Sequence, residues 1–180
     1  MEELKIIGKP TIYGDLDFLD HFRFTNGRKF PTSYINFTKK YGYGKVLGQW
    51  LIYIPMGDYS DSWSVQTEAI KATYYDDVMH GNLWFDLEPD GTIEIVKQLV
   101  PFAKSENGYY LFWNLASQPI INEFDIYITD FRGLGMRKVA TSIDELIDKM
   151  IDKNRFKEVL PLFCQEPYLP IFECIEELYY

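Results

Sequence analysis

The sequence predicts an α+β fold, with a single, mostly antiparallel sheet and flanking helices. Helix signals lie towards both ends of the chain, and hairpin signals follow one another between them. Consecutive hairpins build an antiparallel sheet, and the outer helices must bury their apolar stripes against it. A length of 180 residues fits one domain, and a hydrophobic content of 47% supplies enough apolar side chains for a core.

Two helices are predicted before residue 45. The first follows Asp15, a favoured N-cap residue. Its apolar stripe consists of Leu16, Phe18, Leu19 and Phe22. The second begins at Pro31, which suits the first helical position because that position needs no N–H donor. Its apolar face consists of Tyr34, Phe37 and Tyr41, with Gly42 at its end.

Strands dominate the middle of the chain. Residues 46–54 are apolar on both faces, which predicts an interior strand with Trp50 and Ile52 well buried. Residues 65–79 predict a helix. Three hairpins follow, each with glycine in its turn. They join residues 83–87 to 92–96, 99–103 to 109–115, and 124–131 to 136–140.

The chain then returns to helix. Ser142 and Glu145 have the spacing of a capping box. The helix that they start has a buried stripe of Ile143, Leu146, Ile147 and Met150. We expect one domain over residues 1–152, with residues 153–180 as a helical appendix packed on the same domain. Two prolines interrupt this appendix, and its last helix is predicted to start near Pro170.

The charge indicates which partners are suitable. The formal net charge is −9, so nucleic acid is not an expected ligand, because phosphate binding needs a basic surface. An acidic protein is better suited to attract a basic one. The charge is also uneven along the chain. Residues 21–57 contain six Lys and Arg and no acid, whereas residues 58–94 contain nine acids and Lys71.

The sequence also favours one cellular location. Cys164 and Cys174 are too few for a disulfide framework, and we expect them to be reduced core residues. Acids precede the first short apolar run, unlike in a signal peptide. No run approaches the ~20 apolar residues that a membrane helix needs. We therefore expect a soluble, cytoplasmic protein without a membrane partner.

No catalytic set emerges from the residues. A nuclease-like pattern at Glu94 and Lys97 has the wrong spacing, because two intervening residues would place the side chains on opposite faces of a strand. The serines of residues 60–64 lack the Gly-x-Ser-x-Gly surroundings that would expose a nucleophile to a base such as His80. The pair Asp76-Asp77 lacks further oxygen ligands for a metal. We expect no enzyme, no metal and no cofactor.

Three stretches, read in order, resemble a known family. Residues 30–42 place an apolar residue and Pro before two aromatics three apart and a final glycine. Residues 99–115 comprise an apolar-Pro-Phe-Ala strand, a glycine-containing turn and an aromatic strand. Residues 139–147 comprise a strand and a capped helix. Together they resemble the SUKH superfamily, the Smi/Knr-type domains of bacterial immunity proteins and fungal cell-wall regulators.

The resemblance implies a protein-binding domain without catalytic residues. In bacteria such domains typically neutralise toxins, often nucleases, inside the producing cell. A toxin that acts on nucleic acid tends to be basic, which suits the net charge. Asn114 departs from the family pattern, in which many members carry Asp after the aromatic strand. The alternatives are a scaffold or regulator in cell-wall control and an enzyme of unrecognised type.

Residues 58–94 are the predicted partner-binding surface. They combine acids with aromatic rings, and in a tight inhibitor surface rings anchor the partner while charges speed encounter. The candidate steering residues are Asp58, Asp61, Asp76 and Asp77. The candidate anchors are Tyr59 and Trp63. The competing interpretation is a solvated charged face, with Trp63 and Tyr74 in the core.

Overall fold

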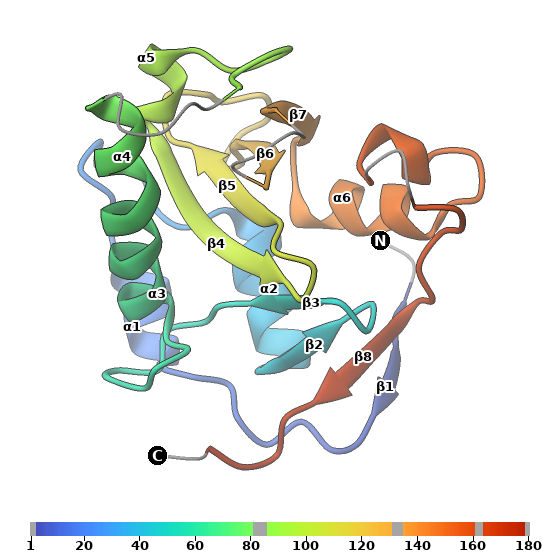
Figure 1. Ribbon diagram of the computed structural model, residues 1–180. Helices are drawn as coiled ribbons and strands as arrows, with labels where there is room; N and C mark the ends of the chain where they lie inside the picture. The colour runs from blue at the N-terminus through green and yellow to red at the C-terminus, as the bar shows by residue number, and fades with distance from the viewer. Residues whose placement is uncertain (1–2, 81–85, 131–134, 161–163, 179–180) are drawn as a thin grey trace.

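The computed structural model describes residues 3–80, 86–130, 135–160 and 164–178 (Figure 1). Within these residues, eight strands form one sheet in the order β1-β8-β2-β3-β4-β5-β6-β7. Neighbouring strands are antiparallel except β1 and β8, which are parallel. The predicted α+β fold with a mostly antiparallel sheet is confirmed.

The element bounds are as follows. The strands are β1 Lys5–Ile7, β2 Gly44–Val46, β3 Trp50–Ile52, β4 Leu99–Ser105, β5 Tyr110–Asn114, β6 Asp125–Thr129, β7 Arg137–Ala140 and β8 Ile171–Cys174. The helices are α1 Leu16–His21, α2 Thr32–Tyr41, α3 Trp63–Ile70, α4 Asp76–Met79, α5 Ile93–Val96 and α6 Ile143–Ile151. A π-helix at Lys71–Tyr75 joins α3 to α4, and a 3-10 helix covers Phe156–Glu158.

Helices pack on both faces of the sheet. Alternate side chains of β5 show the two layers, because successive residues of a strand point to opposite faces. Trp113 lies against Tyr34 of α2, with ring centroids 4.9 Å apart. Phe112 lies against Tyr74 of the π-helix, with centroids 5.2 Å apart. The α3–α4 column therefore stands on the sheet face opposite to α2 (Figure 1).

Several predicted elements are confirmed. The side chain of Asp15 caps α1 by accepting a hydrogen bond of 2.9 Å from the backbone N–H of Phe18. Gly42 follows α2 with a φ of +72°, a conformation that glycine adopts without strain. The hairpins β4/β5 and β6/β7 are present, and Ser142 caps α6. Trp50 and Ile52 are buried, as predicted.

The interior strand predicted at residues 46–54 is wrong, because this segment forms two strands. Leu47 and Gly48 both have positive φ, 56° and 65°, and the N–H of Gln49 donates to the carbonyl of Val46. Two consecutive left-handed residues reverse the chain and join β2 to β3 in a tight hairpin. The apolar run is therefore a folded-back pair of strands.

The hairpin predicted at residues 83–87 and 92–96 is also wrong in its second arm. Residues 83–85 lie outside the described residues, and Ile93–Val96 forms the short helix α5. Thr92 caps it, since its side-chain oxygen accepts a hydrogen bond of 3.2 Å from the N–H of Ile95. The local capping interaction favours helix over the alternating pattern read from the sequence.

The helix predicted from Pro170 is a strand. β8 lies between β1 and β2, and Phe172 at its centre is fully buried against Tyr41 and Phe37 of α2. The last described segment therefore completes the sheet and is no helical appendix. Cys164 and Cys174 are free and half-buried, not fully in the core. Among the described residues, no helix has the length and apolarity to cross a membrane.

Candidate binding groove

A row of cross-strand neighbours forms the floor of a groove on the α3 side of the sheet. Lys45 on β2 pairs with Leu51 on β3, Leu51 pairs with Lys104 on β4, and Lys104 pairs with Tyr110 on β5. Register places these four side chains on one face, because directly paired residues point the same way. We call Lys45, Leu51, Lys104 and Tyr110 the sheet row. Their neighbours Val46, Trp50 and Ile52 are buried on the other face.

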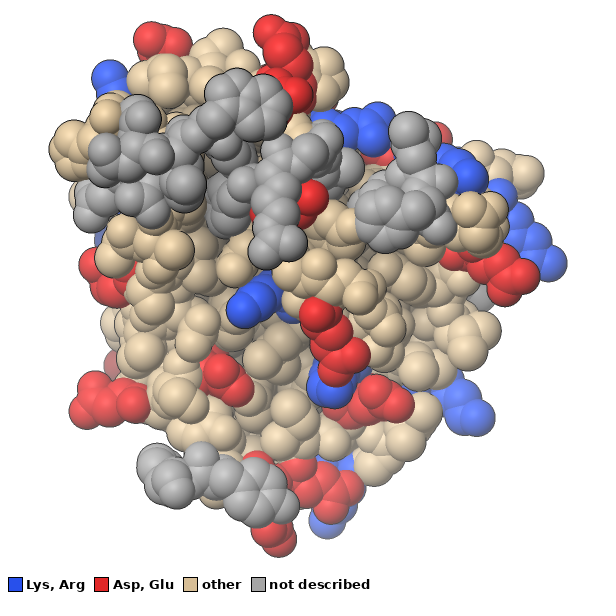
Figure 2. Space-filling model, in the orientation of Figure 1, with Lys and Arg blue, Asp and Glu red and all other residues tan. Residues whose placement is uncertain are grey.

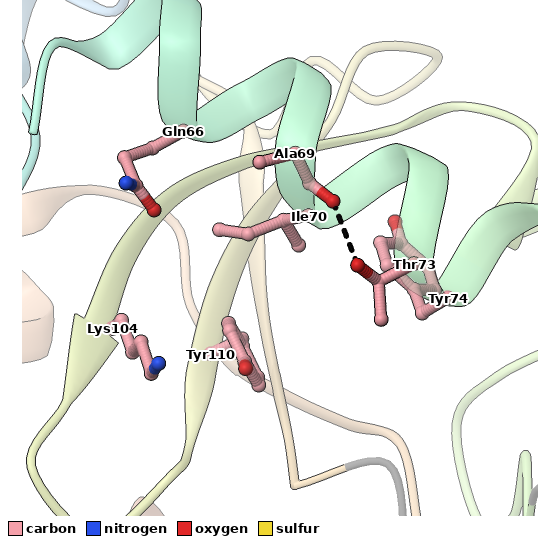
Figure 3. Close-up of a pocket in the computed structure, with 7 residues that line it drawn as sticks. All are labelled: Gln66, Ala69, Ile70, Thr73, Tyr74, Lys104 and Tyr110. Atoms are coloured by element: carbon pink, nitrogen blue, oxygen red, sulfur yellow. Dashed lines mark hydrogen bonds between the residues drawn. The ribbon is translucent and has the colours of Figure 1, made fainter. Parts of the chain in front are cut away.

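Helix α3 and the π-helix form the wall beside the sheet row. The side chains that line the groove recur at helical spacing, which places them on one helix face. We call this set the helix stripe: Gln66, Ala69, Ile70 and Thr73. The helix is fixed at its base, because Thr67 donates a hydrogen bond of 3.2 Å to the carbonyl of Pro101 on β4. Figure 3 shows Ile70 facing Lys104 and Tyr110 across the hollow.

The groove consists of two adjoining hollows that share Gln66 and Lys104. The larger has a volume of about 480 Å³ and the smaller about 200 Å³. The larger is lined by Lys45, Gln49, Leu51, Tyr53, Asp61, Gln66, Lys104, Ser105 and Glu106. The smaller is lined by Gln66, Ala69, Ile70, Thr73, Tyr74, Lys104 and Tyr110. The larger hollow is lined mostly by polar side chains, whereas the smaller one adds Ala69, Ile70 and two tyrosine rings. This combination of polar and apolar surface suits recognition of a partner segment.

Charges of both signs line the larger hollow. Lys45 forms an ion pair with Glu106, and this hydrogen bond raises the pKa of the lysine. Asp61, half-buried, accepts a hydrogen bond of 2.6 Å from the hydroxyl of Tyr43. Burial, and then Asp61, raises the pKa of Tyr43 well above its ordinary value. The phenol therefore stays protonated and continues to donate to the carboxylate.

The predicted surface residues divide between the groove, the exterior and the core. Asp61 lines the groove, whereas Asp58 is exposed on the same loop and does not line it. Tyr59 packs against Tyr43 and Ile54 in a small second apolar cluster. Trp63 is only 5% exposed and packs against Phe30 at a centroid distance of 4.8 Å. Trp63 is therefore buried in the core, as the competing interpretation expected, and Tyr59 is buried too. The anchor role of both rings in partner binding stays a prediction.

The acids of residues 58–94 do not form one patch. Asp58 and Asp61 precede α3 at one end of the helical column, whereas Glu88, Asp90 and Glu94 lie around α5 at its other end (Figure 1). Acidic groups on the face shown in Figure 2 are dispersed among basic and uncharged groups. The side chains of Asp76 and Asp77 lie outside what the structure describes, so their steering role stays a prediction. Charge concentrated in the sequence is thus distributed in space.

The residues considered as catalytic candidates have structural roles in the fold. Ser62 is fully buried and accepts a hydrogen bond of 2.9 Å from the N–H of Met56. Glu94 and Lys97 do not lie on a strand, contrary to the prediction, because they belong to α5 and its C-cap. There, hydrogen bonds from the backbone N–H of Glu94 and from Thr92 lower the pKa of Glu94, with a smaller contribution from Lys97. Within the described parts of the chain, no three His, Cys, Asp or Glu side chains are grouped as metal ligands.

Most of the groove was not predicted from the sequence. Lys104 is the one exposed residue of β4. A lysine within an otherwise apolar strand could have been recognised in the sequence as a surface position. The helix stripe was also readable from its spacing at positions 66, 69, 70 and 73. Lys45 and Tyr110 join them only through strand register, which the sequence does not give. Asn114 is buried and accepts a hydrogen bond of 3.0 Å from the N–H of Ala116. It therefore closes a turn and does not line the groove.

The fold and the groove define an α+β domain with a groove between the sheet row and the helical wall of α3 and the π-helix. Residues 25–147 match the family model described as SUKH_6, SMI1-KNR4 cell-wall. Because the match covers more than half of the chain, the protein belongs to this family, and the resemblance read from the sequence is confirmed. The matched range contains the sheet row and the helix stripe, whereas β1 and β8 lie outside it. No curated protein and no solved structure matches the chain significantly.

Proposed function

We propose that the protein is a non-catalytic, protein-binding domain that acts as an immunity protein and neutralises a basic, nuclease-type toxin. The observation that carries this proposal is the groove between α3 and the sheet row. It is open, extends over four strands, and is lined by side chains that offer both charge and apolar surface. Family membership supports the same function, since immunity proteins use this kind of domain.

Net charge supports the identity of the partner. A chain with a net charge of −9 attracts a basic protein, and the attraction raises the association rate more than the affinity. Steering of this kind reflects the summed charge distribution of the protein. Asp58 is exposed and can contribute to it, whereas Asp61 also lies where a bound partner would contact the groove.

Co-expression with toxins tests the proposal. Toxin domains encoded beside the gene, and a panel of basic nuclease toxins from related strains, are expressed in cells with and without this protein. We expect survival with the protein present, and a stable complex of purified toxin and protein. Toxicity that persists for every toxin encoded beside the gene would contradict the proposal.

A control separates neutralisation from an indirect effect on growth. Toxins from the panel that have unrelated catalytic domains should still kill the cells, because an immunity protein recognises one cognate surface. Purified protein added to the cognate toxin should stop cleavage of nucleic acid at an equimolar ratio. Protection without such inhibition in the test tube would point to a different mechanism.

The words "cell-wall" in the family description favour a second candidate, a scaffold or regulator in cell-wall control. This candidate predicts that deletion of the gene alters sensitivity to wall-active antibiotics in the absence of any toxin. The immunity function predicts normal sensitivity. The deletion strain therefore distinguishes the two candidates.

A further inference from the structure

Two charged side chains in the groove have no counter-ion. Neither the carboxylate of Asp61 nor the ammonium of Lys104 has an oppositely charged group within 4.0 Å in the described part of the chain. Asp61 accepts its hydrogen bond from a neutral tyrosine. Lys104 extends over the ring of Tyr110, with its Nζ 5.6 Å from the ring centroid. The groove thus offers one anion and one cation to a ligand.

The other charged pair in the groove is already satisfied. Lys45 and Glu106 bind one another, so they contribute no net charge to the larger hollow. Among the side chains that the structure describes, the smaller hollow has no acid in its lining and Lys104, at its border, as its one cation. The order along the groove is therefore a free anion, a free cation and then an uncharged hollow.

The dimensions suit an extended polypeptide segment. Neighbouring strands lie about 4.8 Å apart, so the sheet row from Lys45 to Tyr110 spans roughly 14 Å. An extended segment advances about 3.3 Å per residue, so about four residues cover the row. The helix stripe lies along the same path, with Gln66 and Thr73 at its two ends. A ligand in the groove would therefore meet the charges in a fixed order.

We propose that the groove binds an extended segment of the partner protein with a defined charge order. A basic residue of the segment pairs with Asp61, a following acidic residue pairs with Lys104, and an uncharged side chain enters the smaller hollow. This inference rests on the proposed function and specifies how its partner is recognised. Both ion pairs gain from partial burial, because hydrogen bonds to charged groups are stronger where water is excluded.

Selection from a display library of random peptides tests the inference. Peptides of about twelve residues, roughly 40 Å long when extended, are selected on the immobilised full-length protein. We expect enriched sequences to carry a basic and an acidic residue at a constant spacing. Selection on Asp61→Asn should lose the basic preference and keep the acidic one, and selection on Lys104→Gln should do the reverse.

Matched variants control for the change in net charge. Glu166→Gln alters an exposed acid that precedes β8, and Lys97→Gln alters an exposed lysine at the end of α5; neither residue lines the groove. An enriched peptide should bind both controls as it binds the wild type. It should bind each groove variant about tenfold more weakly, a change of about 1.4 kcal/mol.

Two outcomes overturn the inference. One is a library that yields no enriched peptide, and the other is an enriched peptide that binds Asp61→Asn and Lys104→Gln as well as the wild type. Melting temperatures verify that the variants fold. If loss of the Tyr43 hydrogen bond destabilises the Asp61→Asn protein, peptide binding to Lys104→Gln alone tests the inference. Toxin neutralisation in cells is measured separately, so immunity through another surface remains detectable when peptide binding fails.

Discussion

Trp63 is surrounded by aromatic rings of the N-terminal segment. Phe18, Phe22, Phe24 and Phe30 all lie within 6.4 Å of it, measured between ring centroids. The sequence could not assign Trp63 to the core or the interface, because aromatic rings suit both and its neighbours come from residues 18–30. Asp61, two residues earlier, is half-buried and lines the groove, and its steering role stays a prediction.

Trp63→Ala should lower stability without directly affecting partner binding. Removing a buried tryptophan leaves a cavity and costs about 3–5 kcal/mol of unfolding free energy. Chemical denaturation measures this loss, and Asp58→Asn, at an exposed site on the preceding loop, should leave stability unchanged. A Trp63→Ala protein with wild-type stability and weakened toxin binding would show that Trp63 contributes to the partner interface instead.

Glu123 is a buried carboxyl group that links three segments. Its two oxygens accept hydrogen bonds from the backbone N–H of Ser33, at 2.8 Å, and from the Ser33 hydroxyl, at 2.7 Å. The same hydroxyl accepts a hydrogen bond of 3.1 Å from the N–H of Ile143 at the start of α6. Burial raises the pKa of Glu123 above its ordinary value of 4.5, although the Ser33 hydrogen bonds partly oppose this.

The raised pKa predicts the direction of a pH effect on stability. The folded protein holds this proton more tightly than the unfolded chain does, so the contribution is fully present below pH 4.5. It is lost as the pH rises through the raised value. In urea unfolding from pH 4 to 7, the free energy of the wild type relative to Glu123→Gln should therefore fall with increasing pH. Parallel stability curves would show that Glu123 is not the titrating group.

At the scale of elements, local signals predicted the helices and hairpins, and non-local pairing decided the rest. The caps Asp15 and Ser142 and the hairpin turn at Gly108 act within a few residues, so the sequence reveals them. The segment that begins with β8 has apolar residues at positions 171, 174, 175 and 178, a spacing typical of a helix. Residues 171–174 nevertheless form a strand, because they pair with β1 on one side and with β2 on the other. Both partner strands lie more than a hundred residues earlier in the chain.

Phe172→Ala tests the structural role of β8. The ring is fully buried against α2, so its loss should cost about 3–5 kcal/mol. Leu169→Ala is the control, because that side chain is 69% exposed just before the strand and should contribute little. If both variants unfold at the wild-type urea concentration, β8 is dispensable for the fold.

At the scale of the molecule, the sequence predicted one mostly antiparallel sheet and a protein-binding role, but it did not locate the groove. The sheet row combines four strands through their register, and the wall depends on how α3 lies across β4. Both are properties of tertiary packing. The acidic segment identified from composition contributes Asp61 to the groove, while its other described acids lie outside it.

The net charge predicts how salt affects partner binding. Raising the ionic strength screens the attraction between this acidic protein and a basic toxin, so the association rate should fall steeply. The dissociation rate should change little, because it depends on short-range contacts. Surface plasmon resonance at several salt concentrations measures both rates. An association rate independent of salt would contradict the electrostatic part of the account.

One pair of variants tests whether the groove is the partner-binding surface. Ala69 and Ala72 are both exposed and lie three residues apart on the same helical column, but only Ala69 lines the groove. An arginine at position 69 projects into the smaller hollow, whereas one at position 72 adds the same charge and size outside it. The measurement is the affinity of the cognate toxin for Ala69→Arg and Ala72→Arg, with melting temperatures recorded for both. We expect at least about tenfold weaker binding for Ala69→Arg and nearly wild-type binding for Ala72→Arg. Equal affinities for the two variants would contradict the claim that the toxin binds in the groove.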